Sequence, residues 1–313
     1  MDTKLLLPVL SIVLVAGCVG LDLDNVTGGT GMGISGNGLE ITSFTAEPST
    51  VFSGSSVRLI MEVENKGGTN VPSGDSVVYI TGANFDDWND GDSAYYEGLK
   101  EMRAEDIVRG VPASTDRVSL TVTAPDLEPG QTRNDIFFGR VYDDYKTSAQ
   151  GTIWVYSETE SEAAREAGRE MYAPSFTYTK GPVGLAVSVT PTPIIMYDEG
   201  ENSFTVFITI SNLASGTIYS PNTLDYSAND VQLTMDEINK VDVEVTADPE
   251  LSILNPEDCS GEDLELVAGR DMTLVCDLEV DGSVPTFDSF SFDVTVSYGY
   301  YTEAKASVTV QGR

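Results

Sequence analysis

Histidine is absent from the 313 residues, and its absence excludes several classes of catalytic site. Without an imidazole the chain cannot build a Ser-His-Asp or Cys-His nucleophile system, or the two-histidine zinc site of many metalloproteases. An enzyme on this sequence would have to rely on carboxylates, Lys, Tyr or a bound cofactor. No spacing of acidic residues singles out a catalytic pair, so the sequence predicts a protein that is not an enzyme and carries no cofactor.

Positive charge is scarce. The chain has 17 Lys and Arg against 50 Asp and Glu, which gives a formal net charge of -33. A surface this acidic repels nucleic acid and anionic lipid headgroups, so nucleic acid is excluded as a partner. The length allows two ordinary domains, and 41% hydrophobic residues is enough to give each of them a core.

Cysteine is also scarce, and the first of the three cysteines, Cys18, ends a distinctive N-terminal stretch. Lys4 precedes the apolar run 5–16, and small residues lead directly into Cys18. This arrangement resembles the lipobox of prokaryotic lipoproteins. The resemblance implies that 1–17 is a removed signal peptide and that lipid on Cys18 anchors the chain to the outer face of the cytoplasmic membrane, at the cell surface. The alternatives are an ordinary cleaved signal with an incidental cysteine, or an uncleaved N-terminal anchor.

The other two cysteines are Cys259 and Cys276. Outside the cytoplasm a remaining pair of cysteines is expected to form a disulfide, although two buried thiols are the alternative. The loop that this bond would close has a length for which chain entropy predicts a stabilisation of about 3 kcal/mol.

Residues 18–38 contain many glycines and no hydrophobic periodicity, which predicts a flexible tether behind the lipidated cysteine. Asn25 begins the sequon Asn-Val-Thr and is a candidate glycosylation site. The glycines of 31–36 match the spacing of a dinucleotide-binding loop. That loop works only between a strand and a helix, so no cofactor site is predicted here.

From residue 39 onward, apolar and polar residues alternate between turns rich in Pro, Gly and Asn, as in antiparallel strands with one buried face. In 57–64 every second residue is apolar: Val57, Leu59, Met61 and Val63. No long amphipathic helix interrupts the series, which favours an all-β sandwich. The predicted strands of the first unit are 39–46, 57–64, 76–81, 117–123, 135–145 and 150–156.

A second unit begins near residue 184 and repeats the first. The segment 57–65 (VRLIMEVEN) matches 204–212 (FTVFITISN), and each ends in an asparagine where a turn should start. The segments 141–155 and 296–310 also align, and we interpret each as a closing hairpin. The chain is therefore predicted to be two copies of one sandwich.

The alternating strand at 57–71 that ends in Glu-Asn-Lys-Gly-Gly, with the acidic Pro-Gly turn at 125–130, resembles the adhesion-related and S-layer-associated immunoglobulin-like domains of archaeal and bacterial surface proteins. The resemblance implies two tandem immunoglobulin-like sandwiches that serve in binding, spacing or wall association. It carries no catalytic residues over to this chain.

The clearest helix is predicted at 157–172, between the two copies. Ser157 followed by Glu160 forms a capping box, and Pro174 prevents the helix from continuing. We interpret it as a spacer, which divides the chain into a first sandwich at 39–157, a helical linker at 158–182 and a second sandwich at 183–313.

The insert at 84–109 combines acidic and aromatic residues. Aromatic rings give rigid contact area at little entropic cost, so Trp88, Tyr95 and Tyr96 are predicted to contact a protein or glycan partner. The alternative is a structural role, in which these rings cover an exposed sheet edge. A solvated acidic turn is favoured over a calcium site, whose weak candidate ligands are Asp86, Asp87, Asn89, Asp90 and Asp92.

Taken together, these features predict a non-catalytic, lipid-anchored cell-surface protein whose loops serve in adhesion or in protein or glycan binding. One alternative is a structural subunit of a surface layer or filament. A carboxylate-based hydrolase is the other, less favoured alternative.

Overall fold

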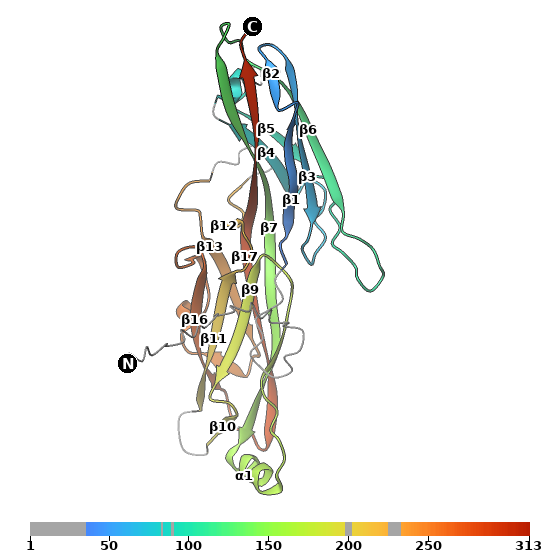
Figure 1. Cartoon of the computed structure of the whole chain (residues 1–313). Coiled ribbons are helices and arrows are strands. Elements are labelled where there is room, and N and C mark those ends of the chain that lie inside the picture. The colour runs from blue at the N-terminus through green and yellow to red at the C-terminus, as the bar shows by residue number, and fades with distance from the viewer. Residues whose placement is uncertain (1–35, 83, 89–90, 198–201, 225–232) are drawn as a thin grey trace, which may run out of the picture.

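The computed structural model describes residues 36–82, 84–88, 91–197, 202–224 and 233–313. The predicted signal peptide, lipidation site Cys18 and sequon at Asn25 lie outside these residues. The described chain is an elongated all-β rod with the C-terminus at one end (Figure 1). The predicted fold class of two β-sandwiches is confirmed.

Two very long strands run through both sandwiches (Figure 1). They are β7 (Thr132–Ser157) and β17 (Phe287–Gln311), which pair antiparallel in one unbroken register. At about 3.3 Å per residue each strand is about 85 Å long. We expected a turn between residues 145 and 150, but the structure has none. Buried and exposed positions keep alternating through Tyr145, Thr147 and Ala149, and no Gly, Pro or Asn interrupts them.

The first sandwich packs a three-stranded sheet against β4, β5 and one half of β7 and β17. The predicted buried positions Val57, Leu59, Met61 and Val63 are all 0% exposed, which confirms the alternation. The bounds are β1 (Leu39–Glu47), β3 (Ser56–Asn65) and β6 (Thr115–Thr123) in the three-stranded sheet, with β4 (Ser76–Gly82), η1 (Phe85–Asp87) and β5 (Ala94–Gly98) opposite.

The second sandwich packs a four-stranded sheet against the other half of β7 and β17 and their neighbours. The four-stranded sheet comprises β9 (Val183–Thr190), β11 (Ser203–Asn212), β14 (Leu251–Ile253) and β16 (Asp271–Val280). The neighbours are β8 (Ser175–Tyr178), β12 (Thr217–Tyr219), β13 (Lys240–Ala247) and β15 (Gly261–Glu265). A short helix, α2 (Pro256–Cys259), is joined to β16 by the predicted disulfide Cys259–Cys276, which is confirmed.

The two sandwiches exchange strands. Ile153 and Val155 of β7 lie in the second core, whereas Val308 and Val310 of β17 lie in the first. The boundaries predicted at 157 and 183 therefore do not separate the two cores. The matched segments of the two copies do not fold back as hairpins; they lie in β7 and β17, which pair side by side through the pair Asp144–Gly299 at the middle of their ladder. We call the region around this pair the waist.

At each end of the rod a short strand from one half of the chain pairs with the long strand of the other half. Strand β2 (Thr50–Phe52) pairs in parallel with the end of β17, and β10 (Ile194–Met196) pairs in parallel with the end of β7. Each copy thus closes on the last strand of the other copy. The two halves of the chain are interlocked by these pairings.

The predicted helix is α1 (Glu158–Ala167), and its cap is confirmed because the Ser157 hydroxyl accepts a hydrogen bond from the Glu160 amide. It ends earlier than predicted, at Gly168, which has φ 63 and adopts the left-handed conformation that favours glycine. Figure 1 places α1 at the end of the rod opposite the C-terminus, so its predicted role as a spacer between the sandwiches is wrong. In the described part of the chain, no helix is long and apolar enough to cross a membrane.

Candidate functional site

Trp88 is a core residue of the first sandwich. Its side chain is 1% exposed, and its ring packs edge-on against Phe137 with the centroids 5.2 Å apart. The indole Nε1 donates to Asp135 Oδ2 at 2.8 Å, and Arg133 Nε donates to the same oxygen. Since a buried ring with a satisfied N–H has no surface to offer, the prediction that Trp88 contacts a partner is wrong. The alternative, a structural role, is the one observed.

The calcium candidates do not converge where the structure describes them. Asp87 forms an ion pair with Arg133, and Asp86 and Asp92 are exposed. Asn89 and Asp90 lie outside the described residues. Within the described ranges, no cluster of three His, Cys, Asp or Glu side chains has a geometry that could hold a metal ion.

Tyr95 and Tyr96 are neighbours on β5, so their side chains point to opposite faces of the sheet. Tyr95 packs against the core of the first sandwich, and its hydroxyl donates to Glu97 at 2.6 Å. Burial and the Glu97 carboxylate raise the pKa of Tyr95 to about 12. Tyr96 points outward, where it joins other tyrosines.

Tyr96 belongs to a cluster of tyrosines on the face of the sheet opposite the first core, which we call the tyrosine face. Neighbouring ring centroids in the cluster are 5.0 to 6.4 Å apart. Tyr142 and Tyr219 are 0% exposed and form its base, whereas the rings of the other three are partly exposed. The members are Tyr79, Tyr96, Tyr142, Tyr219 and Tyr301.

A row of side chains crosses the tyrosine face on four adjacent strands. Tyr96 of β5 pairs with Tyr79 of β4, which pairs with Arg140 of β7, which pairs with Glu303 of β17. Arg140 donates to Glu303 at 2.8 Å and lies 5.2 Å from the centre of the Tyr301 ring. The row thus presents aromatic rings and a fixed planar cation on a rigid sheet, an arrangement suited to contact with a macromolecule.

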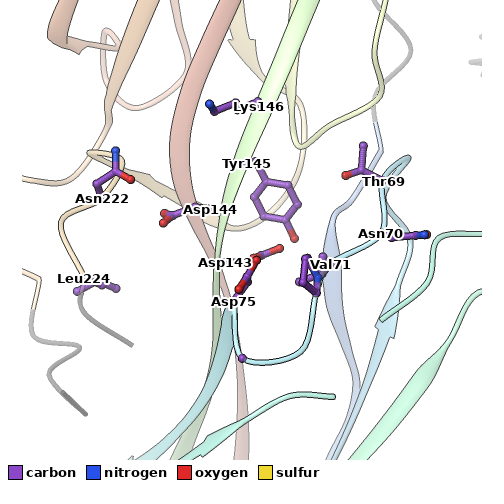
Figure 2. Close-up of a pocket in the computed structure, with 12 residues that line it drawn as sticks. Thr69, Asn70, Val71, Asp75, Asp143, Asp144, Tyr145, Lys146, Asn222 and Leu224 are labelled. Carbon is purple, nitrogen blue, oxygen red and sulfur yellow. The ribbon is translucent and has the colours of Figure 1, made fainter. Parts of the chain in front are cut away.

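A second feature is a cavity of about 600 Å³ at the waist, shown in Figure 2. Three segments that are distant in sequence meet there: the loop between β3 and β4, the middle of β7, and the chain after β12. We call it the waist cavity. It is lined by Thr69, Asn70, Val71, Pro72, Gly74, Asp75, Asp143, Asp144, Tyr145, Lys146, Asn222 and Leu224.

Asp143 is the unusual residue of this cavity, because its side chain is 3% exposed and its Oδ2 atom has no hydrogen-bond partner among the described residues. Its cross-strand neighbour Ser76 is 0% exposed, and the Ser76 hydroxyl likewise lacks a partner within the described chain. The Tyr145 hydroxyl accepts from the Leu39 amide at 2.7 Å and is hydrogen-bonded to the Asp143 carboxyl. Figure 2 shows the Tyr145 ring pointing toward Asp143.

Burial raises the pKa of Asp143 to about 8, against an ordinary value of 3.8. The hydrogen bond from Tyr145 opposes this shift, and the nearby negative charges of Asp144 and Asp75 add to it. No salt bridge in the described ranges includes Asp75 or Asp143.

Sequence reasoning named only Tyr96 of the tyrosine face and missed the waist cavity. Asp143 occupies a position that alternation assigns to the buried face of its strand, two residues from Val141 and from Tyr145. A carboxylic acid at such a position was a readable signal. The tyrosine face had no such signal, because its rings come from strands whose pairing the sequence did not reveal.

No family model matches the chain, and no curated protein is similar to it in sequence. Solved structures with some likeness include Escherichia coli alpha-2-macroglobulin activated by porcine elastase, with 8% identity, a TM-score of 0.20 and coverage of 88% of this chain but 22% of that one. The C-terminal globular domain of an oligosaccharyltransferase from Pyrococcus abyssi has 10% identity, a TM-score of 0.22 and coverage of 84% of this chain and 45% of that one. The Enterococcus faecalis MSCRAMM ACE has 10% identity, a TM-score of 0.16 and coverage of 87% of this chain and 95% of that one. Likeness at this level identifies neither a family nor a function, so the function has to be inferred from the sites themselves.

Proposed function

We propose that this chain is a non-catalytic cell-surface protein, anchored by lipid on Cys18, that binds a surface protein or glycan through the tyrosine face. The observation that carries the proposal is the row of partly exposed rings, Tyr96 and Tyr79, beside Arg140. Tyrosine and arginine are enriched where proteins bind one another, because they supply large contact area with few rotatable bonds. The strongly paired sheet beneath them holds the row rigid.

The position of the first described residues fits an anchored rod. The Gly36 amide donates to the carbonyl oxygen of Gly181, and Leu39 contacts Tyr145, so the chain enters the structure at the waist. A lipid on Cys18 would therefore hold the rod near its middle. Eighteen residues span at most about 65 Å, so the waist would lie within that distance of the membrane.

The binding surface is tested by changing Tyr79 and Tyr96 to Ala in the purified chain. Binding to arrayed proteins and glycans from the envelope of the producing cells should weaken at least about five-fold, which corresponds to about 1 kcal/mol. Tyr172→Ala is the matched control, since Tyr172 is 60% exposed and packs on Trp154 near the end of β7, outside the tyrosine face. Binding that survives the double change, with a large fall in melting temperature, would show that the rings only cover the sheet.

The anchor and the absence of catalysis need separate measurements. Cys18→Ser should move the protein from the membrane fraction to the medium, and retention in the membrane would contradict the lipid anchor. Envelope glycans incubated with the wild-type chain should be recovered intact. Release of reducing sugar that depends on Asp143 would instead favour the hydrolase alternative.

A further inference from the structure

The waist cavity is lined by Asp143, whose buried Oδ2 atom has no hydrogen-bond partner among the described residues. Its cross-strand neighbour Ser76 does not line the cavity, and the Ser76 hydroxyl also lacks a partner within the described chain. Buried polar groups in native proteins nearly always have partners, and an exception needs an explanation. A ligand in the cavity that donates a hydrogen bond to Asp143 Oδ2 would be one.

The charge of the cavity indicates the sign of that ligand. Asp75, Asp143 and Asp144 contribute three carboxyl groups, and Lys146 is the single cation among the lining residues. The net charge of the chain, -33, also attracts cations to its surface. A positively charged donor is therefore the best match.

The size and lining of the cavity favour an organic cation over a metal ion. About 600 Å³ is far more than one ion fills and lies within the range of small-ligand sites. The described carboxylates do not group in a way that could hold a metal. Val71, Pro72 and Leu224 supply apolar wall, against which an alkyl stem can lie.

The polar atoms favour an ammonium group over a guanidinium. A guanidinium is recognised best by two oxygens in a planar, bidentate arrangement. Here Tyr145 is already hydrogen-bonded to the Asp143 carboxyl, which leaves one oxygen, Oδ2, without a partner among the described residues. A compact ammonium, with three donors in a tripod, can donate to a single oxygen and does not need a planar pair.

We propose that the waist cavity binds a lysine side chain of the partner protein, with its ammonium on Asp143 and its stem against Val71 and Leu224. This proposal rests on the proposed function and narrows the partner to a protein. Leu224 lines the cavity and also packs against the tyrosine face, so the two features are neighbours.

The test uses the purified full chain and the probe Nα-acetyl-lysine N-methylamide, with binding followed by calorimetry and NMR shifts. The wild type should bind this probe, and the norleucine analogue, which has the stem without the ammonium, should bind at least ten-fold more weakly. Asp143→Asn should also weaken binding at least ten-fold. Asp75→Asn, an exposed change at the rim, should weaken it about three-fold, and Asp126→Asn, an equal charge change on a distant exposed residue, should have no effect.

Several results would overturn the proposal. Equal binding of the lysine and norleucine probes would show that the site does not recognise the ammonium group. Equal binding of the arginine analogue would show that the site does not distinguish an ammonium from a guanidinium. Calcium that displaces the probe and loses its own binding in Asp143→Asn would make this a metal site. An envelope partner that binds wild type and Asp143→Asn equally well would overturn the lysine site alone, whereas a chain that binds no envelope component would overturn the proposed function. Should Asp143→Asn fail to fold, the three-fold loss expected for Asp75→Asn and the comparison of the lysine and norleucine probes on the wild type still test the proposal.

Discussion

Replacing Asp143 by Asn should stabilise the protein at neutral pH, and the gain should disappear in acid. The carboxyl is 3% exposed and its folded-state pKa of about 8 lies above the ordinary 3.8. A group with a raised folded-state pKa binds its proton more tightly in the folded chain. Its stabilising contribution is therefore complete below pH 4 and is lost as the pH rises from 4 to 8. Asparagine keeps the shape of the side chain and removes this dependence.

The size of the effect follows from the pKa difference. Each pH unit between the two pKa values costs about 1.4 kcal/mol of folding free energy. At pH 7 the accumulated cost is on the order of 4 kcal/mol, a large part of the stability of an ordinary domain. The groups that face Asp143 are Asp75, Asp144 and Tyr145, and none of them is changed in the variant.

Urea unfolding at pH 4.5, 6, 7 and 8 measures the difference between variant and wild type. Acid also relieves the self-repulsion of the whole chain, but that effect is nearly common to both proteins and cancels in the difference. The difference should grow steadily with pH up to pH 8, whereas Asp126→Asn should follow the wild type throughout. A difference that is independent of pH would refute the reasoning, because it would mean that Asp143 is ionised in the folded protein.

Three further predictions follow from the packing. Trp88→Ala should lower the free energy of unfolding by about 3 to 5 kcal/mol, because it empties a core site and removes one hydrogen-bond donor from Asp135. The fraction of this variant that stays folded should still bind its envelope partner. Cys276→Ala should cost about 3 kcal/mol, and an unchanged urea midpoint would contradict a structural role for the disulfide. A chain ended at residue 157 should not fold, because its core lacks Val308 and Val310, and a dispersed NMR spectrum of this fragment would disprove the exchange of strands.

Local signals carried the sequence predictions that succeeded. Alternation assigned the buried face of β3 correctly because a strand with one solvated face has a period of two. The cap at Ser157 was readable because hydroxyl-to-amide geometry involves only residues three apart. The internal repeat could be predicted because strands in equivalent positions of two sandwiches carry similar patterns of apolar and polar side chains.

Long-range pairing was not readable in the same way. The segment around Lys146 was interpreted as a turn because a hairpin was the nearest pairing for two strands that close one sandwich. The structure instead continues the strand and pairs it with residues about 150 positions later. The same limit applies to Trp88: an indole in an acidic insert reads as an exposed anchor until Asp135, 47 residues away, is seen to accept its N–H.

The paired ladder of β7 and β17 has a mechanical consequence. Its 25 residue pairs run along the rod, with hydrogen bonds perpendicular to the strands. A tensile force applied to the two ends of the rod would load these bonds in shear, many at a time, instead of opening them one after another. Tandem domains joined by a linker would yield first at the linker, but here no linker lies between the sandwiches. Such a rod would carry a pull between its two ends as a single stiff body.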